Sequence, residues 1–150
     1  MQIIPLFFAV LIFIGMIFNQ NLNFADTSNA NGEAMAISGS MEVYRNCVLI
    51  YAQNNPAATG TVADSALNLP SWFVKMNGVS NYVTGGKGYV WYATTQPVGS
   101  ALTSQILQDT NNLINVGIDQ NGVLFNPIAG TTTITLPATI PNGSVVIADN

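Results

Sequence analysis

The feature that most constrains the fold of this chain is an apolar run near its start. Residues 3–18 read IIPLFFAVLIFIGMIF, without a charged or hydrogen-bonding side chain. A helix rises about 1.5 Å per residue, so this run covers roughly 24 Å of a hydrocarbon core about 30 Å thick. The flanking residues 1–2 and 19–24, which are rich in amide side chains, can lie at the membrane interface and complete the span. We therefore expect residues 1–24 to form a transmembrane anchor.

A cleaved secretory signal, cut after Ala25, is the alternative interpretation. Such a signal normally begins with basic residues and has small residues at both recognition positions. Here no Lys or Arg precedes the run, and Asn23 stands two before Ala25. A lipoprotein would need a Cys directly after the apolar run, but the single Cys is Cys47. A type IV prepilin would need its processing Gly before the apolar run, but Gly15 lies inside the run. These signals favour a retained anchor.

The charges near the span bear on its orientation. The first Lys or Arg is Arg45, so loop charge contributes little, and the two-residue leader with its single amine favours a cytoplasmic N-terminus. We expect a protein of the bacterial inner membrane, with residues 25–150 as a periplasmic domain.

Composition argues against several classes of function. Three basic residues stand against seven acidic ones, so no basic patch is present to bind nucleic acid. The sequence has no His, one Cys and dispersed acids, which disfavours a metal site and excludes an internal disulfide. Neither Lys75 nor Lys87 has a Ser-Lys context, and the acids stand singly. We expect no catalytic, metal or cofactor residues, and a cell-wall hydrolase with paired carboxylates is the remaining enzyme alternative.

Apolar residues between positions 33 and 54 recur at alternating steps of three and four, which predicts a helix with a heptad seam. The seam residues are Ala34, Ile37, Met41, Tyr44, Val48 and Tyr51. This seam can form a coiled coil with a partner or a second copy, or it can pack on the protein's own sheet. Its short length and Gly39 at its middle favour the sheet. Glu42 and Arg45, three apart, are expected to pair weakly.

The ends of this helix have signals of their own. Asn54-Asn55-Pro56 ends it, because the residue before proline avoids helical geometry. The Asn-rich residues 19–32 are expected to be a polar spacer or a helix start, with Thr27 or Ser28 as the N-cap.

A glycine-rich turn separates two predicted strands, residues 79–83 and 89–93. The turn reads TGGKG, which raises the question of a phosphate-binding loop. That motif requires Ser or Thr after the Lys and a helix after the loop. Here Gly88 and Tyr89 follow Lys87 and a strand is predicted next, so we expect a hairpin.

The rest of the chain completes an α+β pattern. A second helix is predicted over residues 99–112, with Ser100 as its N-cap and Leu102, Ile106 and Leu107 buried. Strands are predicted at residues 116–118, 123–125, 131–136 and 144–148, the first two joined by an Asn-Gly turn. The expected fold class is an N-terminal transmembrane helix followed by a long amphipathic helix packed on a mostly antiparallel sheet, with a second short helix.

Several phrases of the sequence resemble the PilM family of conjugative-plasmid thin pili, which are type IVb pili. They are MEVYRNCVLIYAQNNP at 41–56, GTV at 60–62, LPSWF at 69–73 and LPATIPNGSVVIA at 136–148. The resemblance covers nearly the whole chain, and it does not concern the larger actin-like protein of the same name. It implies a small inner-membrane component of the pilus base or the pilin transport apparatus, with no catalytic residues to carry over.

These observations predict a non-enzymatic assembly component that binds other type IVb pilus biogenesis proteins. Low charge content suits a surface that meets protein partners. The candidate interface residues are Trp72, Phe73, Tyr89, Trp91 and Tyr92, with self-association possible through the heptad helix. Trp72 and Phe73 suit a core position as well as an interface, and the core position is favoured. A secreted or surface binding module released by cleavage, and a minor pilin-like subunit, stay open as alternatives.

Overall fold

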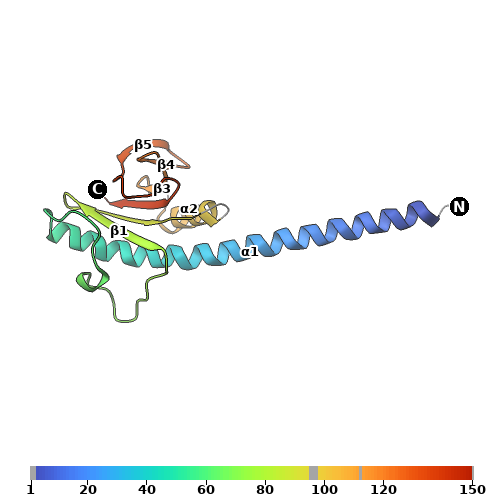
Figure 1. Cartoon of the computed structure of the whole chain (residues 1–150), viewed down its shortest axis with the longest axis horizontal. Coiled ribbons are helices and arrows are strands. Elements are labelled where there is room, and N and C mark those ends of the chain that lie inside the picture. Colours follow the sequence, from blue (N-terminus) through green and yellow to red (C-terminus); the bar gives the residue numbers. More distant parts are fainter. Residues whose placement is uncertain (1–2, 95–97, 112, 150) are drawn as a thin grey trace.

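The computed structural model describes residues 3–94, 98–111 and 113–149, with side chains from Asn29 onward. Two helices, one 3₁₀ turn and six strands make up this part of the chain. They are α1 Ile3–Asn54, η1 Asp64–Ala66, β1 Val79–Thr84, β2 Lys87–Tyr92, α2 Val98–Asp109, β3 Val116–Gln120, β4 Val123–Asn126, β5 Gly130–Thr135 and β6 Val145–Asp149. Figure 1 shows the C-terminal part of α1 lying along the sheet and its N-terminal part extending past it.

The six strands form one antiparallel sheet in the order β1-β2-β6-β3-β4-β5. The C-terminal strand β6 therefore lies in the interior, between β2 and β3. All five of its residues are buried, which explains the uninterrupted apolar run VVIA at the end of the sequence. The predicted α+β class, with two helices on an antiparallel sheet, is confirmed.

The heptad seam of α1 packs on the protein's own sheet, as its short length and Gly39 predicted. Five of its six residues, all except the half-buried Tyr51, are buried in a core shared with α2 and β6. Leu102, Ile106 and Leu107 of α2 are buried in the same core, as predicted. The seam is therefore occupied within the chain, and the α1 side chains left at the surface lie outside it.

A second core lies on the opposite face of the sheet. It consists of Tyr89, Trp91, Leu124, Leu136, Ile140, Val146 and Ala148. Alternation along β2 divides its side chains between the two faces, so that Val90 joins the helix-side core and its neighbours Tyr89 and Trp91 join the second core. Leu136 and Ile140 come from the segment after β5, which closes over this face.

Both predicted hairpin turns are confirmed. Gly85 and Gly86 link β1 to β2 with φ of 58° and 76°, and Asn121 and Gly122 link β3 to β4 with φ of 57° and 83°. Two consecutive residues with positive φ define the tight turn that matches strand twist, and Gly and Asn adopt it most readily. Lys87 is the first residue of β2, so the glycine-rich run is a hairpin turn.

Helix boundaries differ from the prediction at two places. Helix α1 continues through residues 19–32, so neither Thr27 nor Ser28 begins a helix. The stretch contains no Pro, and helical residues on both sides favour propagation over the weak preference of Asn for other structures. Helix α2 begins at Val98, so Ser100 is its third residue and not its N-cap, and it ends early because Asn111 adopts φ of 55°.

The expected Glu42–Arg45 pair is replaced by a longer-range ion pair. Arg45 Nε donates to both carboxylate oxygens of Asp149 in β6, at 2.8 and 2.7 Å. The Asp149 side chain is 6% exposed, so a charged partner lowers the cost of burying it far more than a partner at the surface would. Glu42 is left with a buried Oε1 that accepts no hydrogen bond.

The predicted anchor falls outside the part of the chain whose side chains are described. Among residues 29–94, 98–111 and 113–149, no helix is both long and apolar enough to cross a membrane. The anchor of residues 1–24 stays a prediction.

Candidate interaction groove

An open groove of about 340 Å³ lies between α1 and the loop that leads into β1. Its lining residues come from one face of α1 and from the loop. They are Ala36, Gly39, Ser40, Val43, Trp72, Phe73, Val74 and Met76. All eight are uncharged, and we call this feature the Trp72 groove.

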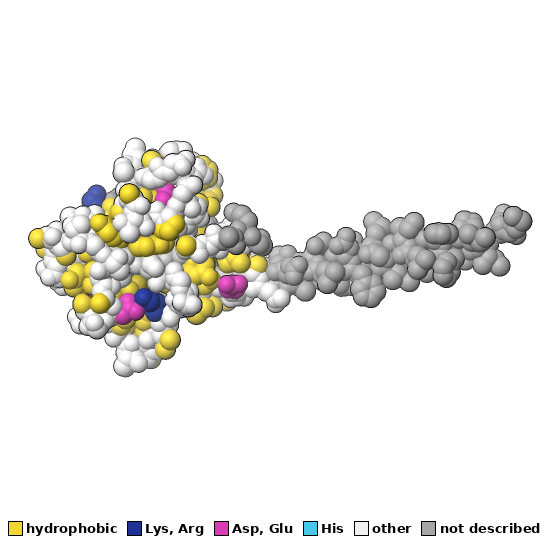
Figure 2. All heavy atoms as spheres, in the orientation of Figure 1, with side chains coloured by type: hydrophobic (Ala, Val, Ile, Leu, Met, Phe, Trp, Pro, Cys, Tyr) yellow, Lys and Arg dark blue, Asp and Glu magenta, His cyan; other side chains and the backbone are white. Residues whose placement is uncertain are grey.

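Large apolar side chains form the outer wall of the Trp72 groove. Val74 is 84% exposed and Trp72 is 71% exposed, the two highest values among the large apolar residues of the described chain. Met76 is also exposed, as is Met35, which lies one turn before Gly39 on α1. Figure 2 shows one face of the domain, where charged side chains are few and hydrophobic ones lie in several patches. Apolar surface gathered at one place is typical of an interaction site.

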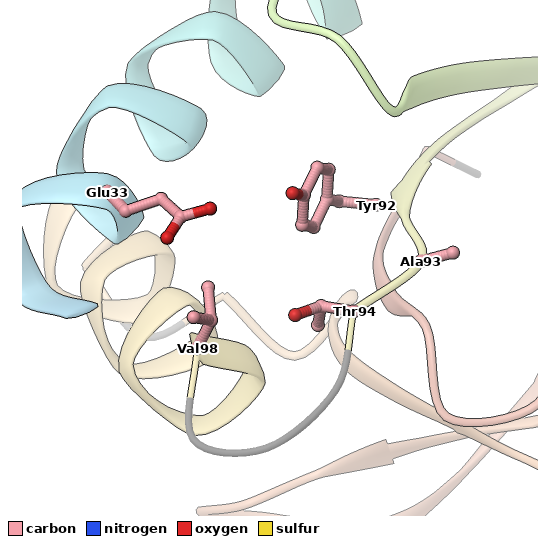
Figure 3. Close-up of a pocket in the computed structure, with 5 residues that line it drawn as sticks. All are labelled: Glu33, Tyr92, Ala93, Thr94 and Val98. Atoms are coloured by element: carbon pink, nitrogen blue, oxygen red, sulfur yellow. The ribbon is translucent and has the colours of Figure 1, made fainter.

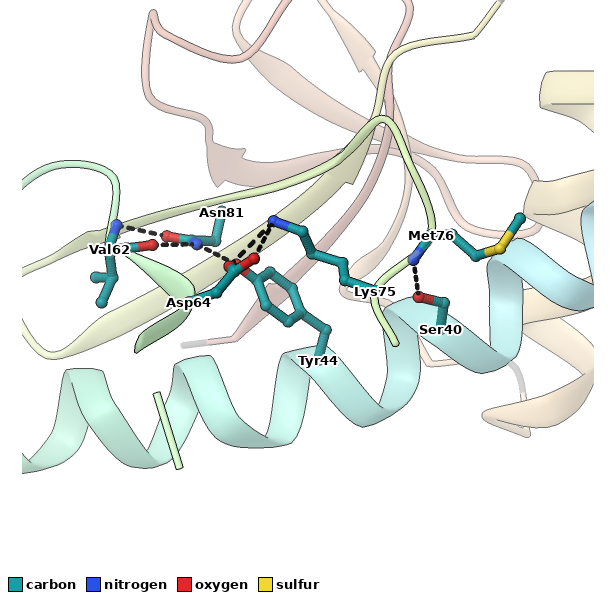
Figure 4. A network of polar contacts seen from close by, with 7 residues as sticks. All are labelled: Ser40, Tyr44, Val62, Asp64, Lys75, Met76 and Asn81. Atoms are coloured by element: carbon teal, nitrogen blue, oxygen red, sulfur yellow. Dashed lines mark hydrogen bonds and ion pairs between the residues drawn. The ribbon is translucent and has the colours of Figure 1, made fainter. Parts of the chain in front are cut away.

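A polar network beneath the loop fixes its position (Figure 4). Tyr44 of α1 donates its hydroxyl proton to Asp64, and Lys75 Nζ lies 3.0 and 2.8 Å from the two Asp64 carboxylate oxygens. Asn81 of β1 donates to the Tyr44 hydroxyl at 2.6 Å and exchanges two hydrogen bonds of 2.8 Å with the backbone of Val62. The network thus joins α1, η1, the loop and β1.

Contacts alternate along the loop. Phe73 stacks on Tyr44 at 6.3 Å between ring centroids, Lys75 Nζ lies 4.9 Å from the same ring, and the Met76 amide donates to Ser40 Oγ at 3.0 Å. These inward contacts leave Trp72 and Val74 on the outside of the loop. The exposed apolar side chains are therefore held in place by their neighbours, so a partner would meet a preorganised surface.

The pKa values of Tyr44 and Asp64 are shifted in directions that preserve the network. Burial, and then the hydrogen bond to Asp64, raise the pKa of Tyr44, so its hydroxyl stays a proton donor at neutral pH. Burial acts to raise the pKa of Asp64, but the hydrogen bonds from Lys75 and Tyr44 outweigh it and the pKa is lowered. The Tyr44 phenol thus stays neutral and the Asp64 carboxyl stays ionised near neutral pH, which suits a structural role for this pair.

The five predicted interface aromatics do not form one surface. Only Trp72 is exposed, while Phe73 and Tyr92 are half-buried against the helix-side core. Tyr89 and Trp91 are buried in the second core, so they offer no surface to a partner. The sequence pattern could not distinguish these cases, because aromatics alternating along a strand suit a covered sheet face as well as an open one.

Val74, Met76 and the helix residues of the groove were not among the predicted site residues. Residues 72–76, WFVKM, carry a weak signal, since alternate side chains there point inward and outward. The part of the groove that α1 contributes could not be predicted, because it depends on the contact of Met76 with Ser40, 36 positions away in the sequence.

A second open pocket, of about 400 Å³, lies near the start of the described side chains (Figure 3). Glu33, Tyr92 and Thr94 face a shared space there, with Val98 beside them. The ionisable side chains that line this pocket are one carboxylate and one phenol, which do not form a recognisable catalytic group. Across the described residues, no group of three or more His, Cys, Asp and Glu side chains could hold a metal ion.

Comparison with known proteins points to one family. The sequence model of the PilM family matches residues 8–148. A crystal structure assigned to PilM from Escherichia coli B7A is similar in fold, with a TM-score of 0.56 and 23% identity over 79% of this chain and 92% of that one. A second, assigned to PilM from Pseudomonas aeruginosa 2192, has 34% identity over 79% and 96% of the two chains and a TM-score of 0.44. Comparison with curated proteins gave no significant match.

Proposed function

Because the chain belongs to the PilM family, we propose that it is a non-enzymatic assembly component of a type IVb thin-pilus machine. In this proposal residues 1–24 anchor it in the bacterial inner membrane with the N-terminus in the cytoplasm. Residues 25–150 then form a periplasmic domain that binds other pilus biogenesis proteins. The observation that carries the binding role is the Trp72 groove, an exposed apolar surface held rigid from below.

The physics of the groove suits protein binding. Trp72 and Val74 lie in water in the free chain, and covering them removes apolar area at about 25 cal/mol per Å². Little loop ordering is required on binding, because Phe73, Lys75 and Met76 already fix the backbone. A central exposed Trp is also the residue type that most often dominates binding energy at interfaces.

Substitutions at the groove test the binding role. We expect Trp72→Ala to reduce co-purification of other pilus proteins with the full-length chain by tenfold or more, because an interface Trp is typically worth about 2 kcal/mol or more. Ile128→Ala is the matched control, since Ile128 is 66% exposed but does not line the groove. Pilus number per cell is the second readout.

Equal co-purification and equal pilus numbers for both variants, at equal protein levels, would overturn the binding role of the groove. Circular dichroism of the purified variants checks that each remains folded.

A separate experiment tests the anchor. In spheroplasts, a C-terminal tag should be digested by added protease, and the intact mass should include residues 1–24. A shortened, soluble product would favour the secreted binding module instead.

One observation favours the minor pilin-like subunit as a second candidate. Helix α1 is a single element from Ile3 to Asn54, so the apolar run and the core seam belong to one helix. Such a helix can pack beside identical helices in a fibre while the domain stays outside. Detection of the full-length chain along sheared pili would support this candidate, and its retention in the membrane fraction would exclude it.

A further inference from the structure

We propose that Asn77 is a site of spontaneous deamidation, which places a negative charge beside the Trp72 groove. Asn77 and Gly78 form the turn between the loop and β1, directly after Met76 of the groove lining. The covalent change is independent of the proposed function. Only its effect on partner binding rests on that function.

The reaction is an attack of a backbone amide on the preceding side chain. The amide nitrogen of the residue after Asn loses its proton and bonds to the Asn side-chain carbonyl carbon, and the side-chain nitrogen takes up a proton and leaves as ammonia. Water, the only co-reactant, then opens the succinimide ring to give aspartate or isoaspartate. Glycine is the most reactive following residue, because it has no Cβ atom to hinder the approach of its amide.

The chain has four Asn-Gly pairs, which begin at Asn31, Asn77, Asn121 and Asn142. The sequence alone therefore gives four equal candidates. The structure distinguishes them through the hydrogen bond that each Gly amide makes. An amide that donates to a fixed acceptor is held away from the Asn carbonyl, and its hydrogen bond must break before it can attack.

Three of the four Gly amides are engaged. Gly32 lies within α1, where each backbone amide donates to the carbonyl group four residues earlier. Gly122 donates to Asp119 Oδ1 at 2.7 Å, and Gly143 donates to the Asp119 backbone carbonyl at 2.9 Å. At each of these pairs the attacking group is already hydrogen-bonded, so the reaction is slowed.

The pair at Asn77 differs from the other three. Within the described part of the chain, the Gly78 amide donates no hydrogen bond and the Asn77 side chain has no hydrogen-bond partner. Both residues are exposed, so water reaches the carbonyl carbon and the ring that forms there. The turn is closed by the Val79 amide, which donates to the Met76 carbonyl at 3.2 Å, and Gly78 has a φ of 90° that favours glycine.

Deamidation changes the surface beside the groove. Both products have a carboxylate at position 77 in place of a neutral amide, and isoaspartate also lengthens the main chain by a methylene group. Met76 lines the groove, and its amide donates to Ser40 Oγ at 3.0 Å (Figure 4). A carboxylate next to Met76 is costly to bury, so a partner that covers this end of the groove binds the deamidated chain less tightly.

Peptide mapping of the folded, full-length chain tests the site. The protein is incubated at neutral and at mildly alkaline pH, and the peptides that contain the four Asn-Gly pairs are followed by mass spectrometry. We expect deamidation at position 77 to be at least tenfold faster than at positions 31, 121 and 142, which corresponds to about 1.4 kcal/mol in the barrier. Alkaline pH should accelerate it, because the attacking amide must lose its proton.

Unfolding the chain provides the control for sequence effects. In denaturant the hydrogen bonds of Gly32, Gly122 and Gly143 are lost, so the four rates should converge. Equal rates in the folded chain, or a faster reaction at any of the other three pairs, would overturn the assignment of Asn77.

Variants at position 77 test the effect on binding. Gly78 is left unchanged, since a Cβ atom there would lie 2.8 Å from Tyr92 Cε2. Asn77→Asp introduces the carboxylate directly, while Asn77→Gln keeps an amide that reacts more slowly because its side chain is longer. We expect Asn77→Asp and the aged wild-type chain to lose co-purified pilus proteins, and aged Asn77→Gln to retain them.

The outcomes separate this inference from the proposed function. If position 77 is deamidated but Asn77→Asp retains its partners while Trp72→Ala loses them, the groove binds partners and the effect of deamidation on binding is refuted. If Trp72→Ala also retains all partners, the binding role of the groove fails and the deamidation site stands. If position 77 reacts no faster than the other pairs, the site is refuted whatever Trp72→Ala does.

Discussion

At the scale of single residues, Glu42 of α1 has one buried carboxylate oxygen that lacks a hydrogen-bond partner. Nearby Asp109 receives the Ser38 hydroxyl at 2.8 Å. Burial first, and then the negative charge of Asp109, raise the pKa of Glu42, while Arg45 acts in the opposite direction. Glu42 is therefore a source of instability once it ionises.

We predict that Glu42→Gln stabilises the protein at pH 7 and not at pH 4. The folded state holds the Glu42 proton more tightly than the unfolded state, so stability falls as pH rises from the ordinary value of 4.5 through the raised folded pKa. Gln cannot ionise and avoids this loss. Denaturant unfolding of both proteins at the two pH values gives the comparison, and an equal difference at both would contradict the assignment.

Tyr44 lies at the centre of the polar network beneath the groove. We predict that Tyr44→Phe costs about 1 to 3 kcal/mol, because Asn81 and Asp64 each lose a buried or partly buried partner. Urea unfolding measures the cost, with Tyr51→Phe on the same helix as the control. The substitution should also weaken binding at the groove, since the Lys75–Asp64 contact loses its support. A stability unchanged from the wild type would show that the network is dispensable.

At the scale of elements, one ion pair connects the first helix to the central strand. Arg45 of α1 and Asp149 of β6 have side chains that are 21% and 6% exposed. We predict that Arg45→Met costs about 3 kcal/mol, the lower end of the range for a broken buried pair, because Asp149 stays buried without its partner. The double variant Arg45→Met, Asp149→Leu should recover most of the loss in urea unfolding. Additive losses in the double variant would argue against the pairing.

Gly39 gives a prediction of opposite sign on α1. Gly39→Ala should raise the free energy of unfolding by up to about 1 kcal/mol, since the added methyl group meets open space and alanine favours the helix. Gly32→Ala, with equally open surroundings, is the companion variant. Destabilisation by Gly39→Ala would mean that the helix needs glycine for a reason inside the chain.

The sequence predicted elements where local signals are strong. The heptad seam gave α1 from Glu33 onward, and Gly85-Gly86 and Asn121-Gly122 gave both hairpins. It did not predict that α1 runs unbroken through residues 19–32, because one glycine and several Asn residues are too weak to stop a helix that is supported on both sides. The position of β6 between β2 and β3 also escaped prediction, since strand order depends on contacts between distant segments.

The candidate site was predicted only in part for the same reason. Trp72 was identified as a candidate, and it is the exposed aromatic of the groove. Tyr89 and Trp91 were proposed alongside it but are buried, because Leu136 and Ile140 cover that face of the sheet. The sequence of β2 alone does not indicate that Leu136 and Ile140 cover this face of the sheet.

At the scale of the whole molecule, the chain combines a long helix, a domain with few charges and an apolar groove beside that helix. The proposed anchor would hold α1 upright at the membrane, with the groove beside the helix where neighbouring proteins pass. Weak charge leaves apolar contact as the main source of affinity, so binding at the groove should change little with salt concentration.

The most direct test of the account is photocrosslinking from position 72 in cells that assemble pili. A photoreactive amino acid replaces Trp72 in the full-length chain, and the same residue replaces Ile128 as the control. We predict adducts with other pilus biogenesis proteins from position 72, and none from position 128. Equal labelling from the two positions, or no adduct from position 72 in cells with normal pili, would contradict the claim that the groove is the interaction surface.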